Sequence, residues 1–236
     1  MSDTQKTTAL TLVLVGSQGS GKSATGNTIL KRERFKSCMG TIATTESVSK
    51  EVMSHGENSV TIVDTPPLSS TETLMTIIKH DLSKHQQTTA VYAVVITIGR
   101  FTKEEENVLD GLLSKSFMQG RTLFVFTRKN ELKDPNYREE ERVERWLNSE
   151  PTIRRWMREY KIKNYFAIEN PSENYDRILE MIDVAVNMND LQKKENCFEK
   201  KIFHGGIPVA AVIPAVVVLT VVVLVLGILY FNCSSI

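Results

Sequence analysis

A strand-like apolar run that leads straight into a glycine-rich loop constrains the fold of this chain more than any other feature. The run is Ala9 to Val15, ALTLVLV, and the eight residues after it read GSQGSGKS. A near-continuous apolar run is typical of a strand buried on both faces of a parallel sheet. Helical spacing follows from Lys22 to Lys31. In this strand–loop–helix setting the pattern G-x-x-x-x-G-K-[ST] predicts a site for phosphate groups.

The residue types in this loop have chemical reasons. Glycines let the backbone curl so that N–H groups converge on phosphate oxygens, and the following helix N-terminus adds partial positive charge. Lys22 would bridge the terminal phosphates, and the hydroxyl of Ser23 would ligate Mg²⁺. A glycine-rich turn that only caps a helix is the alternative. The predicted phosphate-binding residues are Gly16, Ser17, Gln18, Gly19, Ser20, Gly21, Lys22, Ser23 and Ala24.

Strand and helix patterns alternate along the following residues. Further strands are expected at 60–63, 90–98, 121–127 and 164–168, and helices at 74–82, 102–113, 135–147, 152–160 and 175–194. This alternation predicts an α/β fold, a mainly parallel sheet with helices on both faces. Trp146 and Trp156 are expected in the core, and His80 and His85 in solvent.

The C-terminal segment from Ile207 to Phe231 carries no charge and is almost entirely apolar. As a helix it would span roughly 37 Å, against a hydrocarbon core of about 30 Å, so we expect a transmembrane helix rather than a core helix. Four lysines precede it and no basic residue follows, which by the positive-inside rule keeps the N-terminal part in the cytosol. The sequence therefore predicts a tail-anchored protein.

The expected organisation has five parts. They are a polar extension at 1–8, a phosphate-binding domain at 9–195, a juxtamembrane linker at 196–206, a transmembrane helix at 207–231 and a short tail at 232–236 on the luminal or exoplasmic side. The charge balance, 29 basic against 28 acidic residues, gives no overall field for nucleic acid. Three scattered cysteines exclude a secreted disulfide scaffold, and the four histidines lack metal-ligand spacing.

Two strings resemble signatures of the AIG1-type, or GIMAP, immune-associated GTPases. Residues 23–30, SATGNTIL, are similar to the family's GKSATGNxIL signature, and residues 98–105, IGRFTKEE, are similar to its GRFTxEE box. The resemblance covers roughly residues 10–191. It implies a septin-like G domain of the P-loop NTPase class that binds GTP or GDP with Mg²⁺. It also implies a homo- or heterodimer with related G domains, and often a hydrophobic C-terminal anchor.

The same resemblance assigns the metal-side residues. Thr45 would be the switch I threonine that completes Mg²⁺ coordination, with Thr44 as the alternative. Asp64 would hold a Mg²⁺-bound water at the carboxyl edge of the sheet. The family continues D-T-P-G after this strand, whereas here the residues are D-T-P-P, so Pro67 offers no N–H to a γ-phosphate. Losing that donor would cost about 1–3 kcal/mol of discrimination between tri- and diphosphate.

The base-side residues follow the third and fourth long strands. The family shows T-R-K-D where this chain has TRKN, so Asn130 stands for an aspartate that accepts from guanine, and Arg128 would pack on the base. Asn170 matches a family asparagine, whereas Glu169 does not. The Glu169 carboxylate, or that of Glu131, is a candidate for the missing acceptor, although a glutamate at a strand end is usually solvated.

Arg100 of the GRFT box has two readings. It would act in trans as an arginine finger across a dimer, or it would be a surface arginine paired with Glu104 or Glu105. No glutamine after Asp64 is placed to position water, so any GTPase activity is expected to be slow. The alternative function is a nucleotide-locked or nucleotide-free scaffold that recruits partners at a membrane. A nucleotide-kinase-type phosphotransferase is a third reading, against which both family strings argue.

Overall fold

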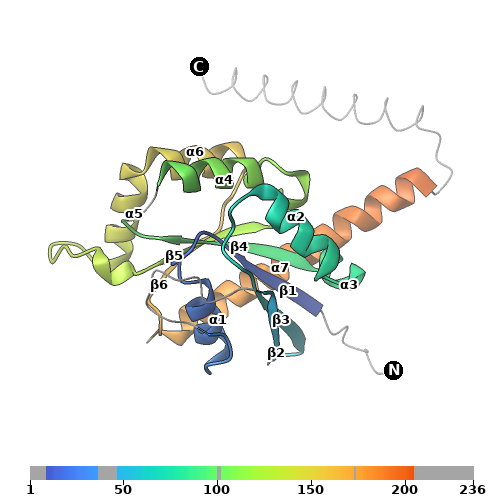
Figure 1. The fold of residues 1–236 in the computed structure, drawn as a ribbon, viewed down its shortest axis with the longest axis horizontal. Helices are drawn as coiled ribbons and strands as arrows, with labels where there is room; N and C mark the ends of the chain where they lie inside the picture. Colours follow the sequence, from blue (N-terminus) through green and yellow to red (C-terminus); the bar gives the residue numbers. More distant parts are fainter. Residues whose placement is uncertain (1–8, 37–46, 100–101, 173, 205–236) are drawn as a thin grey trace, which may run out of the picture. The chain divides into compact units, whose positions relative to one another are not determined.

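The structure is a computed structural model that describes residues 9–36, 47–99, 102–172 and 174–204. Its centre is a six-stranded sheet in the order β2-β3-β1-β4-β5-β6 (Figure 1). Only the β2–β3 pair is antiparallel, and the other neighbouring strands run parallel. The strands are β1 (Ala9–Val15), β2 (Ser49–His55), β3 (Asn58–Asp64), β4 (Ala90–Thr97), β5 (Thr122–Thr127) and β6 (Tyr165–Ile168).

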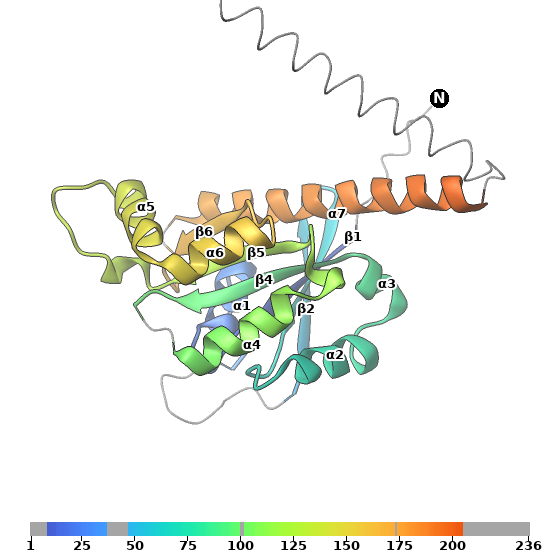
Figure 2. The same cartoon turned by 90° about the horizontal axis from the view of Figure 1, so that it is seen from above.

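Helices cover both faces of the sheet, as the alternating pattern predicts. Figure 2 shows α7 along one side of the sheet and α2 and α4 along the other. The helices are α1 (Lys22–Leu30), α2 (Thr71–His80), α3 (Lys84–Thr88), α4 (Lys103–Leu113), α5 (Glu139–Ser149), α6 (Pro151–Glu159) and α7 (Tyr175–His204). Two single-turn 3₁₀ helices, η1 (Ser116–Met118) and η2 (Lys129–Glu131), flank β5.

The alternation of side chains along β1 divides the core into two layers. Leu12 and Leu14 pack with buried residues of α1 and α7. Val13 and Val15 face the other way, into a cluster built from α2, α4, α5 and α6. Because successive strand residues point to opposite faces, a strand apolar at every position requires a helix layer on each side. The apolar runs of β1, β4 and β5 meet this condition, and all residues of β4 and β5 are buried.

Several elements differ from the sequence-based expectation: the short helix α3 is not predicted, and α7 continues to His204 instead of ending near residue 194. The strand β2 is not predicted, because its sequence SKEVMSH has no apolar run and all of its residues are exposed or half-buried. The charged helix α5 begins at Glu139 rather than at Pro135. Asp134 Oδ1 accepts the backbone N–H of Asn136 at 3.0 Å, so Pro135 lies in a side-chain-stabilised turn ahead of the helix. The Arg138 N–H donates to Glu141 at 3.1 Å and closes the first turn.

The chain divides into two compact units, one that ends at Gln192 and one that begins at Lys193. Within the second unit the description reaches His204, the last residue of α7. No helix among the described residues has the length and apolar character needed to cross a bilayer. The expected transmembrane helix at 207–231 and the tail at 232–236 lie outside the described residues.

Candidate functional site

The loop between β1 and α1 closely approaches the ends of neighbouring strands. A Cβ on Gly16 would lie 2.4 Å from the backbone carbonyl oxygen of Val95 in β4. Only glycine therefore fits at the position where the loop begins after β1. Gly21 has a φ of 95°, in the left-handed region that favours glycine, and a Cβ there would lie 3.2 Å from Thr127 Cγ2. These two glycines let the backbone curl against β4 and β5.

The N-terminus of α1 lacks the side-chain cap that α2, α3 and α4 carry. In α2 and α4 the hydroxyls of Ser70 and Thr102 accept N–H groups of the first turn. The cap position of α1 is Gly21, no side chain caps the helix, and its first turn contains no acidic residue. The N-terminal amides and the helix dipole therefore favour an external anion, and phosphate is the anion that such loops bind.

Lys22 is buried beneath the loop. Its Nζ donates to the carbonyl oxygens of Gly16 at 3.2 Å and Ser17 at 2.8 Å. Burial lowers the pKa of Lys22 to about 8, an effect that the negative charge of Asp64 partly opposes. A buried ammonium whose hydrogen-bond partners are neutral carbonyls is under-compensated, and a phosphate would supply the opposite charge.

The metal-side residues predicted from the sequence come together in the structure. Asp64 ends β3 and is 1 % exposed, and its Oδ2 accepts the hydroxyl of Ser23 at 2.6 Å. A hydroxyl and a carboxylate at this spacing fit Mg²⁺, which uses few protein oxygens and retains waters. Within the described part of the chain no group of three His, Cys, Asp or Glu side chains could hold a metal alone.

The hydroxyl of Ser20 is buried and forms no hydrogen bond within the described residues. A buried hydroxyl without a partner carries a desolvation cost that a bound polar group would relieve. The residues present thus fit a magnesium–phosphate group: an uncapped helix end, a buried lysine, a Ser–Asp pair and this hydroxyl. Ala24 lies in the first turn of α1, and Gln18 and Gly19 lie exposed at the tip of the loop.

Threonines that the sequence did not single out hold this loop in place. Thr127 Oγ1 donates to the carbonyl of Ser20 at 2.8 Å, and Thr97 Oγ1 donates to the carbonyl of Gly19 at 3.4 Å. Both threonines end buried strands, β5 and β4. The sequence signal that could have identified them is a threonine at the last position of a buried parallel strand. The phosphate loop contacts the sheet at that edge, so such a threonine can bond to the loop.

The segment after Asp64 contacts the loop through its backbone. The Leu68 N–H donates to the Gly16 carbonyl at 3.1 Å, and Thr65 Oγ1 donates to the Leu14 carbonyl at 2.7 Å. Pro67 has no N–H. In this conformation neither residue 67 nor residue 68 has a free backbone donor for a γ-phosphate.

On the other side of the loop, the segments after β5 and β6 meet. Glu169 Oε2 accepts the backbone N–H of Asn130 at 3.1 Å. Arg128, whose φ is 61°, donates from Nη1 to Glu131 Oε1 at 3.2 Å. The structure therefore places Asn130 and Glu169 together and pairs Arg128 with Glu131.

The side chain of Asn170 bonds to α1. Its Nδ2 donates to Thr25 Oγ1 at 2.9 Å, and its Oδ1 accepts the hydroxyl of Thr28 at 2.8 Å. Both polar atoms of the amide are thus used in joining the β6 loop to the phosphate-loop helix. This geometry supports a role for Asn170 in positioning α1, and no sequence pattern pointed to the two threonine partners.

Thr44, Thr45 and Arg100 lie outside the described residues. The helix that follows Arg100 is described, and Glu105 forms a capping box with Thr102: its Oε2 accepts the Thr102 N–H at 2.8 Å. One proposed partner of Arg100 is therefore already engaged at the start of α4.

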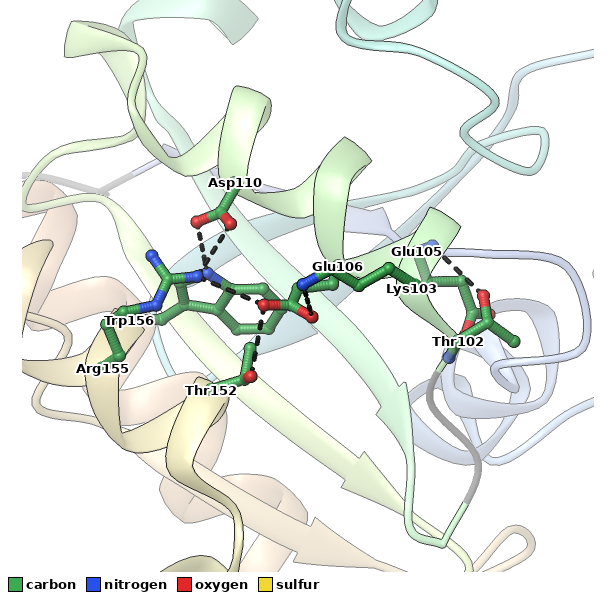
Figure 3. A network of polar contacts seen from close by, with 8 residues as sticks. All are labelled: Thr102, Lys103, Glu105, Glu106, Asp110, Thr152, Arg155 and Trp156. Carbon is green, nitrogen blue, oxygen red and sulfur yellow. Dashed lines mark hydrogen bonds and ion pairs between the residues drawn. The ribbon is translucent and has the colours of Figure 1, made fainter.

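Polar contacts join α4 to α6 (Figure 3). Asp110 accepts the indole N–H of Trp156 at 2.6 Å and the Arg155 guanidinium at 2.7 Å. The Arg155 hydrogen bond is the largest cause of a lowered Asp110 pKa. Trp156 is fully buried and Trp146 packs against the same core, as predicted. His80 and His85 are exposed, as predicted.

The fold and this edge of the sheet together define a P-loop nucleotide-binding domain of the mixed α/β class. The family model described as AIG1 family matches residues 10–209. The chain therefore belongs to the AIG1 family, as the two signature strings indicate.

Among relatives, mouse GTPase IMAP family member 8 is 27 % identical over 203 residues, which cover 83 % of this chain and 29 % of the mouse protein. This chain thus spans less than a third of that relative.

Solved Toc33 structures share the fold. One structure comes from work on the chloroplast translocon components atToc33 and psToc159, which describes dimerization as important for their GTPase activity. It matches this chain with a TM-score of 0.58 and 18 % identity, and the match covers 78 % of this chain and 84 % of the other. Toc33 from Arabidopsis thaliana in complex with GDP and Mg²⁺ has a TM-score of 0.57 and 16 % identity, and covers 77 % and 84 % of the two chains. At this identity the likeness establishes the fold alone.

Proposed function

We propose that this chain binds GTP and GDP with Mg²⁺. The observation that carries the proposal is the uncapped N-terminus of α1 next to the buried Lys22 and the Ser23–Asp64 pair, all at one edge of the sheet. The AIG1 family membership, a relative named as a GTPase, and a neighbour of the same fold bound to GDP and Mg²⁺ support the choice of nucleotide.

Each residue has a defined task in this proposal. The amides of the loop and Lys22 would hold the phosphates, and Ser23 and Asp64 would hold the metal, Asp64 through a water. Thr45 would add a metal ligand from switch I. The magnesium ion supplies charge neutralisation for the phosphates. Thr97 and Thr127 keep the loop in the binding conformation before any ligand arrives, through their hydrogen bonds to its carbonyls.

Hydrolysis in this proposal is slow or absent. Pro67 lacks the N–H that the family glycine offers, and the adjacent Leu68 N–H is bound to the Gly16 carbonyl. Sensing of a γ-phosphate by this segment would require that bond to break. The same observation favours the alternative function, a nucleotide-locked scaffold that recruits protein partners.

We further propose that the protein assembles as a dimer of G domains on a membrane. A neighbour of the same fold has GTPase activity for which dimerization is described as important. Arg100, which follows the strand β4 in the sequence, is the candidate finger in trans. The charge-free segment at 207–231, preceded by lysines, supports a tail anchor with the G domain in the cytosol. Anchoring would raise local concentration and so promote assembly.

Calorimetric titration of GTP, GDP and ATP into the full chain in detergent, with and without Mg²⁺, tests the nucleotide. We expect micromolar or tighter guanine-nucleotide binding that strengthens with Mg²⁺, and no measurable binding by Lys22→Ala. Lys163→Ala is the matched control, because Lys163 is exposed ahead of β6, at the end of that strand opposite to the phosphate loop. Absence of binding in the wild type would refute the proposal, and phosphate release measured on the same samples separates a slow GTPase from a locked scaffold.

A further inference from the structure

The strand order indicates which loops face the base of a bound nucleotide. Asp64 and Ser23, the metal side, lie where β3 and α1 meet on one side of β1. On the other side of β1 come β4, β5 and β6 in turn. A nucleotide whose terminal phosphates lie near the metal side therefore extends its base toward the loops after β5 and β6. Those loops also approach the phosphate loop, since a Cβ on Gly21 would lie 3.5 Å from Asn170 Nδ2.

Most polar side chains of these two loops already have partners within the protein. Arg128 is paired with Glu131, at 3.2 Å. Lys129 is paired with Glu139, at 2.7 Å. Asn170 uses both of its amide atoms on α1. These residues hold the loops together, and their charges or hydrogen-bonding groups are satisfied without a ligand.

Glu169 differs from Glu131 and Glu139, the carboxylates that form these two ion pairs. It is half-buried, and its Oε2 accepts the backbone N–H of Asn130 at 3.1 Å, so it is oriented by a neutral donor and its charge is not neutralised by an ion pair among the described residues. Its neighbour Asn130 is exposed and carries an amide with one acceptor and one donor group. The structure thus places one unneutralised carboxylate and one amide side by side.

We propose that Glu169 is the residue that selects guanine, in the role that the family gives to an aspartate at position 130; this inference deepens the proposed function and rests on it. Guanine presents two adjacent donors, N1–H and the 2-amino group, and a carboxylate offers two acceptors to them. An asparagine has one acceptor and cannot serve both. The Asn130 amide supplies a donor for the 6-oxo group. Adenine offers a single donor and an acceptor nitrogen, which a carboxylate repels.

The Glu169→Gln variant isolates this role. Glutamine can still accept the Asn130 N–H through its amide oxygen, so the contact between the two loops is retained and only the charge and the second acceptor are lost. Charge-assisted hydrogen bonds are about twice as strong as neutral ones, so we expect GDP affinity to fall by about tenfold to a hundredfold. Affinity for IDP, which lacks the 2-amino group, should fall less, and affinity for ADP should not fall.

The experiment is titration of GDP, IDP and ADP, with Mg²⁺, into the full chain in detergent. Glu131→Gln is the matched control, a neighbouring carboxylate that is paired with Arg128, and it should keep the wild-type preference for GDP over ADP. The double variant Asn130→Asp/Glu169→Gln, which returns a carboxylate to position 130, should recover at least tenfold in GDP affinity over Glu169→Gln. Circular dichroism verifies that each variant is folded.

Each outcome is decisive. A wild type that binds no nucleotide refutes the proposed function and this inference with it. A wild type that prefers GDP, with Glu169→Gln keeping the same GDP-to-ADP ratio, overturns the inference alone. Equal losses for GDP and ADP would mark Glu169 as a support of the loop and overturn its role in selection, as would the absence of recovery in the double variant.

Discussion

Replacing Lys22 by methionine should stabilise the nucleotide-free protein while it abolishes nucleotide binding. The Lys22 side chain is 6 % exposed, and its pKa lies at about 8 instead of 10.5, mainly because burial disfavours the charged form. A shift of this size corresponds to about 3 kcal/mol of destabilisation by the ammonium at pH 7, at about 1.4 kcal/mol per pKa unit. Methionine also loses two hydrogen bonds to carbonyls, worth about 1 kcal/mol each. The expected net gain is about 1–2 kcal/mol.

The pH dependence follows from the direction of this shift. Between pH 8 and 10.5 the unfolded state holds a proton at Lys22 that the folded state has released, so this group makes the wild type more stable as pH rises. The advantage of Lys22→Met should therefore be full below pH 8 and shrink above it. Nucleotide affinity of the wild type should fall over the same range, because a neutral amine no longer attracts phosphate.

Urea denaturation of the full chain in detergent, followed by tryptophan fluorescence at pH 7 and 9.5, measures the difference. In thermal denaturation of the same proteins, a gain of about 1–2 kcal/mol in the free energy of unfolding should raise the melting temperature by roughly 2–8 °C for a domain of this size. Lys163→Met is the control, since it removes an exposed lysine ahead of β6 and so carries no burial cost to relieve. A Lys22→Met protein no more stable than the wild type at pH 7, or a gap that stays constant with pH, would refute the argument.

Three further substitutions probe the loop and the core. Gly16→Ala puts a Cβ 2.4 Å from a carbonyl oxygen of β4 and should both lower the melting temperature and remove GTP binding in calorimetry; normal binding would contradict the packing described. Ser23→Ala should weaken GTP binding at least tenfold with Mg²⁺ but little in EDTA, and an equal effect in both would exclude a metal role. Trp156→Phe removes the indole hydrogen bond to Asp110 and should cost about 1–2 kcal/mol in urea denaturation.

The sequence predicts strands well where burial on both faces makes them apolar throughout. This condition holds for β1, β4 and β5, whose runs of Val, Leu, Ile and Phe are unambiguous. It does not hold for β2 at the sheet edge. There Ser49 and Lys50 are exposed, Val52 is 56 % exposed, and only the partly buried Met53 packs against the core. An edge strand is specified by its pairing with β3, which a local pattern does not reveal.

The phosphate loop was recognisable because its chemistry is encoded in consecutive residues. The contacts that hold it are not consecutive: Thr127 and Ser20 are 107 residues apart, and Asn170 and Thr28 are 142 apart. Such pairs depend on strand order and register, which the sequence pattern leaves open. Asn170 shows the consequence: its match to a family motif predicts a nucleotide contact, and no sequence pattern reveals that its amide bonds to Thr25 and Thr28 of α1.

The hydrogen bonds from Thr97 and Thr127 to the loop have a consequence for how the domain opens. These bonds require β4 to stay paired with β1 and β5 with β4, so a partly unfolded form that releases either strand should also lose affinity for the ligand. A bound nucleotide therefore suppresses those openings by mass action. In hydrogen–deuterium exchange, added nucleotide should slow amide exchange deep in the central strands, far beyond the residues it touches.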